Sequence, residues 1–104
     1  MTPEGKVKAA IRETLRKYGD VVYVYMPVPG GYGRTTLDYI GIADGVGFAI
    51  EAKRKGGKPT QRQETIIAQI KAAGGRVFVI DGYAGVIELD EWLTTVVGYN
   101  MEPR

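Results

Sequence analysis

The feature that most constrains the fold is an Asp44-Gly45 dipeptide between two β-rich runs, residues 36–43 and 47–53. Asp-Gly favours a two-residue hairpin turn, because both central positions of that turn adopt left-handed backbone conformations. The two runs are therefore predicted to pair as antiparallel strands, and this pairing decides which of their side chains face each other.

Turn and cap residues divide the rest of the chain around this hairpin. Thr2 and Thr60 are predicted N-cap residues, each at the start of a helix. Gly19 follows the end of the first of these helices, and Gly74 follows the end of the second. The expected elements are a helix over 3–18, strands over 21–26, 36–43 and 47–53, a helix over 61–73, a strand over 76–81 and a short helix over 90–97. This α-β-β-β-α-β-α order predicts one α/β domain over residues 1–104, a mixed sheet with helices packed on it.

The 104 residues include no histidine and no cysteine. Catalytic triads that use histidine, disulfides and Cys/His zinc sites are therefore excluded. Any catalysis must use carboxylates, lysine, arginine, hydroxyls, amides and an oxygen-bound metal ion. No apolar run approaches the roughly 20 residues that span a bilayer, and we expect a cytoplasmic protein of a bacterial or phage-infected cell.

Positive charge is concentrated in the first 80 residues. They carry 13 Lys/Arg against 7 Asp/Glu, whereas residues 81–104 carry one against five. The basic residues cluster over 6–17 and 53–62. Such a field suits a phosphate backbone, although a pair of solvated helix and loop faces would give the same pattern.

Polar residues at apolar positions indicate a candidate site. Glu51 and Lys53 project from one face of the predicted third strand, and hairpin pairing brings Asp38 near Glu51. Ile40 and Ile42 share the face of Asp38, so this aspartate is a charge at the end of an apolar row. A surface ion pair would explain Glu51 and Lys53 alone.

Two helices contribute further exceptions. Gln63 precedes Ile66 by three residues, and Glu4 precedes Val7 by three, so both are predicted on inward stripes. Charges on inward faces are costly unless they are paired or bind a metal. Carboxylates with a backbone carbonyl are ligands that Mg²⁺ or Mn²⁺ prefers, and a neighbouring lysine suits metal-assisted phosphodiester hydrolysis.

The ordered set resembles the PD-(D/E)xK nucleases, and within them the virus-type replication-repair nuclease (VRR-NUC) branch. The resemblance covers residues 4–81, and the matching positions are Glu4, Gly30 to Gly33, Asp38, Glu51-Ala52-Lys53, Thr60 to Gln63, Gly74-Gly75 and Val77 to Ile80. Leu37 stands where the signature has proline. The resemblance implies a restriction-endonuclease-like, Holliday-junction-resolvase-like fold and a role in DNA repair.

The resemblance also implies residue roles. Asp38, Glu51 and the backbone carbonyl of Ala52 would hold Mg²⁺ or Mn²⁺, with Glu4 as an additional candidate ligand. Lys53 would be catalytic, Gln63 would position water or phosphate, and Glu4 would assist. Gln61 competes for the glutamine role, but the Thr60-x-x-Gln63 spacing favours Gln63.

The expected partner is DNA, with branched, flapped or four-way-junction structures favoured by analogy of fold, and a homodimer would widen the basic surface. Candidate DNA contacts are Lys6, Tyr32, Arg34, Arg54, Lys55, Lys58 and Arg62. The alternatives are a nucleic-acid-binding domain that keeps the fold without hydrolysis, and an α/β interaction domain with a surface ion pair.

Overall fold

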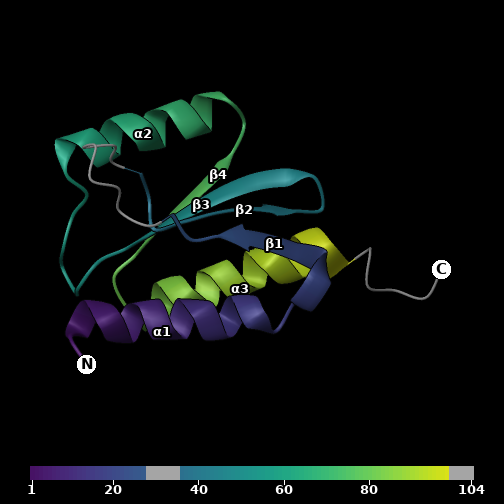
Figure 1. The fold of residues 1–104 in the computed structure, drawn as a ribbon, viewed down its shortest axis with the longest axis horizontal. Helices are drawn as coiled ribbons and strands as arrows, with labels where there is room; N and C mark the ends of the chain where they lie inside the picture. The colour runs from purple at the N-terminus through teal and green to yellow at the C-terminus, as the bar shows by residue number, and fades with distance from the viewer. Residues whose placement is uncertain (28–35, 99–104) are drawn as a thin grey trace.

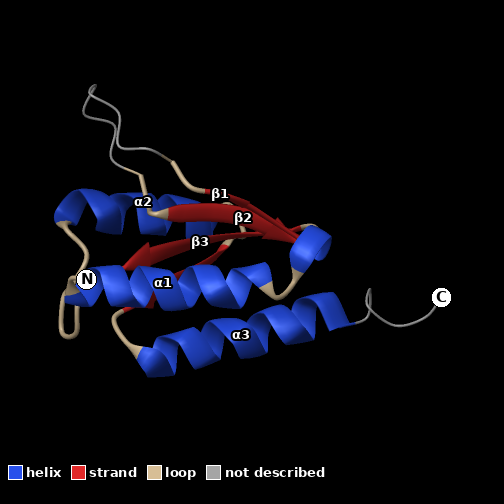
Figure 2. Ribbon diagram, turned by 60° about the horizontal axis from the view of Figure 1, so that its bottom comes forward, coloured by secondary structure: helices blue, strands red, loops and turns tan. Residues whose placement is uncertain are grey.

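The computed structural model describes residues 1–27 and 36–98, which form three layers (Figures 1 and 2). The elements are α1 (Pro3–Arg16), the 3-10 turn η1 (Gly19–Val21), β1 (Val22–Tyr25), β2 (Tyr39–Ala43), β3 (Val46–Ala52), α2 (Gln61–Ala72), β4 (Arg76–Ile80) and α3 (Tyr83–Val97). One face of the sheet carries α1 and α3, and the other carries α2 (Figure 2). The predicted element order and the mixed α/β class are confirmed.

The four strands form one sheet in the order β1-β2-β3-β4. The first two pairings are antiparallel and the pairing of β3 with β4 is parallel. Asp44 and Gly45 have φ values of 48° and 78°, so the predicted left-handed hairpin turn is confirmed. In this register Tyr39 faces Ile50, which places Asp38 beside Glu51 at the end of the ladder.

The main core lies between the sheet and helices α1 and α3. It includes Ile11 of α1, Phe48 and Ile50 of β3, and Leu89 and Leu93 of α3. Phe48, Ile50 and Ala52 all face this core, so Glu51 and Lys53 project from the opposite face, as alternation along the strand predicts. A smaller cluster of Leu37, Ala49 and Ile67 lies under α2.

Local capping explains where the first two helices begin. The Thr2 hydroxyl accepts a hydrogen bond from the Gly5 amide at 3.0 Å, and Pro3 opens the first turn. The Thr60 hydroxyl accepts from the Gln63 amide, and the Gln63 side chain in turn accepts from the Thr60 amide. This reciprocal pair is a capping box, which holds the start of α2 firmly.

The last helix differs from the prediction, which began it at residue 90. It begins at Tyr83, and its N-cap residue, Gly82, makes no side-chain cap hydrogen bond. Without a cap signal, and with Gly85 in its first turn, the sequence carries no mark of this start. Packing decides it, because Val86 and Leu89 are buried against the sheet.

A second difference concerns the apolar row beside Asp38. Ile40 and Ile42 do share the face on which Asp38 was placed, but they are 39% and 52% exposed. Helix α2 packs on Ala49 and Val77 of β3 and β4. Ile40 and Ile42 instead line an open groove whose other wall includes Ile70 and Ala73 at the end of the helix. Among the helices described, none is long and apolar enough to cross a membrane.

Candidate active site

The carboxylate of Asp38 is fixed at the point where β2 and β3 meet. Its Oδ2 accepts a hydrogen bond from the backbone amide of Ala52 at 2.9 Å. Its Oδ1 lies 3.6 Å from the Nζ of Lys8, which comes from α1. The side chain is 27% exposed, with one oxygen held by the backbone of β3 and the other beside the Lys8 ammonium.

Glu51 is the buried charge of the site. Its residue exposure is 4%, and its Oε1 atom has no hydrogen-bond partner among the described residues. Its Oε2 accepts a hydrogen bond from the side-chain Nε2 of Gln63 at 2.9 Å and lies 3.2 Å from Lys53 Nζ. A buried polar atom without a partner is costly, and such an atom in a native structure requires an explanation.

The environment of Glu51 raises the pKa of its carboxyl above the usual range. Burial is the largest cause, because it disfavours the charged form, and the negative charge of Asp38 adds to it. Lys53 opposes this shift by its hydrogen bond and its positive charge. A carboxylate with an unpartnered oxygen, a raised pKa and a second carboxylate beside it is the environment that an added cation would relieve.

Gln63 connects the start of α2 to this carboxylate. Its Oε1 accepts from the Thr60 amide at 2.9 Å, and its Nε2 donates to Glu51. Both ends of the amide are therefore used, which fixes the assignment of oxygen and nitrogen. The predicted proximity of Gln63 to the site is confirmed, while in this structure its polar atoms contact protein groups.

Glu4 lies at the edge of the site rather than on the inward stripe that its spacing predicted. Its side chain is 45% exposed, and its carboxylate is 4.0 Å from Lys8 Nζ. Within residues 1–27 and 36–98, no group of three or more acidic side chains is close enough together to hold a metal. Glu4 is in the first turn of α1, and its side chain is therefore half-exposed at the helix end.

Basic side chains gather next to the acidic pair. A pocket of about 480 Å³ lies between the first turn of α1 and the loop after β3, and its lining residues are Thr2, Pro3, Glu4, Lys53, Arg54, Gly57 and Lys58. The loop is held by hydrogen bonds from the Gly57 amide to the Arg54 carbonyl and from the Gly56 amide to Asp81 Oδ2. Arg54 and Lys58 are thus placed beside Lys53.

The remaining predicted DNA contacts are less localised. Lys6, Lys55 and Arg62 are exposed but do not line this pocket. Tyr32 and Arg34 lie outside the described residues. The structure therefore brings together Asp38, Glu51, Lys53 and Gln63, with Arg54 and Lys58 beside them, and leaves Glu4 at the margin.

Lys8 and Asp81 belong to the site, and the sequence interpretation missed both. Lys8 follows Glu4 by four residues, which is the spacing of a helix-surface ion pair, and that signal was available. Asp81 directly follows β4, and the carboxyl ends of parallel neighbours meet at one edge of a sheet. That rule places Asp81 beside the loop after β3.

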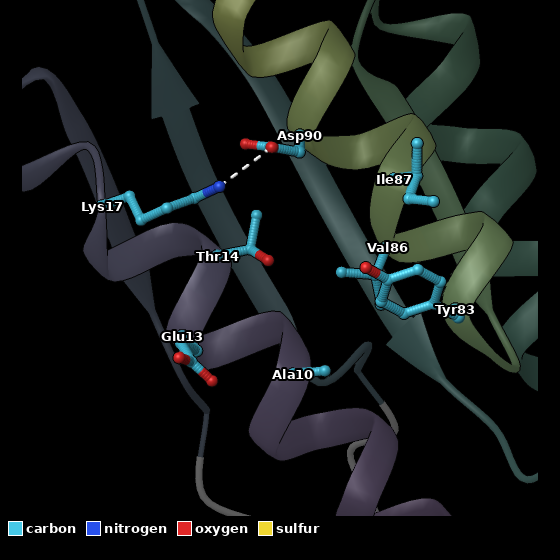
Figure 3. Close-up of a pocket in the computed structure, with 8 residues that line it drawn as sticks. All are labelled: Ala10, Glu13, Thr14, Lys17, Tyr83, Val86, Ile87 and Asp90. Atoms are coloured by element: carbon cyan, nitrogen blue, oxygen red, sulfur yellow. Dashed lines mark hydrogen bonds and ion pairs between the residues drawn. The ribbon is translucent and has the colours of Figure 1, made fainter.

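A second pocket lies on the opposite face of the sheet, between α1 and α3 (Figure 3). Its volume is about 230 Å³, and Lys17 and Asp90 close one end through an ion pair of 2.9 Å. The Tyr18 hydroxyl also donates to the Asp90 carboxylate. Both oxygens of the Asp90 carboxylate have protein partners, and among the described residues the buried side-chain oxygen without a hydrogen-bond partner is that of Glu51.

The donor set around Glu51 fits a divalent cation bound by oxygen. Glu51 Oε1 has no hydrogen-bond partner among the described residues, and Asp38 Oδ1 has only the Lys8 ammonium at 3.6 Å. Ala52, whose carbonyl would be a third oxygen donor, follows Glu51 on β3. Mg²⁺ commonly binds one or two carboxylates and keeps several waters. Two carboxylates therefore satisfy the protein share of such a site.

No protein-family model matches this chain, and no curated protein matches it.

Proposed function

We propose that this protein is a divalent-metal-dependent DNA endonuclease. The observation that carries the proposal is the buried Glu51 carboxylate, which has an unpartnered oxygen beside a second carboxylate and a lysine. A structural ion pair would leave no buried oxygen unsatisfied. A nuclease site would explain the arrangement, because a divalent cation bound from solution would be a partner for this oxygen.

The proposed roles are those that the resemblance implies, and the contacts of Glu51 support them. Asp38, Glu51 and the Ala52 carbonyl would hold Mg²⁺ or Mn²⁺, which when bound lowers the pKa of water and neutralises phosphate charge. Lys53, whose Nζ lies 3.2 Å from Glu51 Oε2, would stabilise the negative charge that develops on the phosphate. Gln63 fixes the orientation of Glu51 through its amide hydrogen bond.

The fold and the partner belong to the same proposal. We propose the restriction-endonuclease-like fold that the resemblance implies, and the mixed sheet with Asp38 just before β2 and Glu51 on β3 supports this proposal. Arg54 and Lys58 beside the site suit a phosphate backbone. We propose branched or flapped DNA as substrate and a homodimer as the active form, since two sites would then face two strands.

Cleavage assays test the proposal. Supercoiled plasmid and labelled flap and four-way-junction DNA are incubated with wild type in Mg²⁺, Mn²⁺ or EDTA. We expect metal-dependent cutting that Asp38→Asn, Glu51→Gln and Lys53→Met each reduce by at least about 100-fold.

Asp90→Asn is the matched control, because it neutralises a carboxylate on the opposite face of the sheet. It is expected to cut within about twofold of wild type at a temperature where it is folded, since Asp90 lies on α3 and touches no described residue of the candidate site. Absence of cutting by wild type with every metal and substrate, or equal cutting by the site variants, contradicts the proposal. Metal-independent binding without cutting would favour the non-catalytic alternative.

A further inference from the structure

Two tyrosines are exposed on the edge strand of the sheet. Tyr23 and Tyr25 are 64% and 55% exposed, and their side chains leave β1 on the same face because they are two residues apart. Ile42 pairs with Tyr23 and Ile40 with Tyr25, and both isoleucines are also exposed. The four side chains form an uncharged apolar surface, which we call the tyrosine face.

The tyrosine face is continuous with the candidate active site. Along β2, Ile42, Ile40 and Asp38 follow at two-residue steps, each of about 6.8 Å. Ala49 faces Ile40, and Glu51 is the next residue of β3 on that side. Tyr25 pairs with Ile40 on the neighbouring strand, and Asp38 is two residues before Ile40, so Tyr25 lies near Asp38 on the same side of the sheet.

Charged side chains lie on one side of the acidic pair, Asp38 and Glu51, and the uncharged tyrosine face lies on the other. The tyrosine face carries no charged side chain, whereas residues 52–63 carry five Lys/Arg and no acidic residue. Three of those basic residues, Lys53, Arg54 and Lys58, line the pocket beside Glu51. A ligand that crosses the site from one side to the other therefore meets positive charge first and flat apolar rings next.

Single-stranded nucleic acid has this combination of properties. Its phosphates suit the basic side, and its unpaired bases can stack on exposed aromatic rings, which tolerate every base. Bases within a duplex are already stacked on one another and present only their edges. Rings that project from the sheet face at a spacing of about 6.8 Å would be accessible to unpaired bases alone.

We propose that the tyrosine face binds unpaired bases of a single-stranded segment next to the phosphate that enters the site. The choice of partner rests on the proposed nuclease function, and it specifies the substrate as DNA with an unpaired segment at the cleavage point. Tyr25 stacks the base nearer to Asp38, and Tyr23 stacks the next one.

Fluorescence anisotropy in EDTA tests this inference without cleavage. Fluorescein-labelled oligo(dT) of 12 nucleotides is compared with a labelled duplex of 12 base pairs. We expect the Tyr23→Ala/Tyr25→Ala variant to bind the single strand at least about tenfold more weakly, and the duplex within about twofold of wild type. The Tyr23→Phe/Tyr25→Phe variant keeps both rings and is expected to stay within about threefold of wild type on both probes.

Tyr83→Ala is the matched control, because Tyr83 is 77% exposed on α3, in the layer on the other side of the sheet. It is expected to bind both probes as wild type does. Circular dichroism melting of each variant verifies that the fold is kept. Equal binding of the single strand by wild type and by the double alanine variant overturns the inference.

Two further outcomes are distinguishable. If light scattering shows a dimer that the double alanine variant loses while single-strand binding is unchanged, the face is a self-association surface and the inference is wrong. If the alanine variant loses single-strand binding but wild type cuts no DNA with any metal, the tyrosine face stands as a binding surface and the nuclease proposal fails.

Discussion

Glu51 and Asp90 are carboxylates on opposite sides of the same sheet, and they differ in burial and in hydrogen-bond partners. Glu51 is buried under α2, and one of its oxygens has no partner. Asp90 lies on α3, where Lys17 forms an ion pair with its carboxylate (Figure 3). The hydroxyl of Tyr18 donates a hydrogen bond to the same carboxylate. The first group is incompletely satisfied, and the second is held by complementary partners.

Their pKa values shift in opposite directions as a result. Burial and then the charge of Asp38 raise the pKa of Glu51, whereas the Tyr18 hydroxyl and then Lys17 lower the pKa of Asp90. The ionised form of Asp90 therefore favours folding, and that of Glu51 opposes it. A charge retained where it opposes folding points to a functional site, whereas the satisfied charge is explained by stability alone.

The largest effect is expected from divalent metal. Mn²⁺ at about 100 times its Kd should stabilise wild type by about 2.7 kcal/mol, because only the folded chain assembles the donors. Glu51→Gln should lose this stabilisation, and Asp90→Asn should keep it. Thermal melts with and without Mn²⁺ measure the stabilisation. An equal rise of the melting temperature in Glu51→Gln and Asp90→Asn would contradict metal binding at Glu51.

A smaller effect is expected at the Asp90 cluster. Tyr18→Phe removes the hydroxyl that contacts the Asp90 carboxylate, the Asp90 carbonyl and Thr94. We expect it to lower the free energy of unfolding by about 1 kcal/mol, the usual contribution of such a hydrogen bond. Urea titration measures the loss. The same variant should leave Mn²⁺ stabilisation unchanged, and a loss of that response would show that the two faces are coupled.

The smallest effect is the pH dependence of stability in EDTA, which should have opposite signs at the two carboxylates. Because the pKa of Glu51 is raised, wild type should gain stability relative to Glu51→Gln as pH falls from 7 through the raised value toward the ordinary glutamate range. Because the pKa of Asp90 is lowered, wild type should lose stability relative to Asp90→Asn as pH falls through and below the ordinary aspartate range.

Urea titrations of the three proteins across pH 3 to 7 measure both differences. The protonated state of Glu51 lacks the penalty of a buried charge, and the protonated state of Asp90 lacks the attraction of Lys17. Two curves of the same sign would mean that burial does not control the ionisation of Glu51.

Predictions that depend on short-range geometry agree with the structure. The Asp44-Gly45 turn sets the hairpin register, and that register alone brings Asp38 to Glu51. Thr60 and Gln63 are three residues apart, and their capping box begins α2 where the sequence predicted a helix. Each of these signals is contained within a few residues, so no knowledge of distant packing is needed to read it.

Predictions that depend on which surface is covered were less accurate. The periodicity that placed Ile40 and Ile42 on one face was right, but whether a helix covers that face depends on where α2 lies. The start of α3 at Tyr83 likewise depends on packing against the sheet. Glu4 is 45% exposed for the same kind of reason, since a first-turn residue at the end of a helix is only partly covered by the layer it packs on.

The sequence by itself determined the element order, the hairpin and the chemistry available to a chain without histidine or cysteine. These follow from backbone preferences and side-chain identity, which are local properties. Tertiary structure alone decided that Glu51 is buried with an unpartnered oxygen, that Lys8 joins Asp38, and that Tyr23 and Tyr25 remain exposed. Burial and partnership depend on segments far apart in the chain, because desolvation is set by what packs over a group and not by its neighbours in sequence.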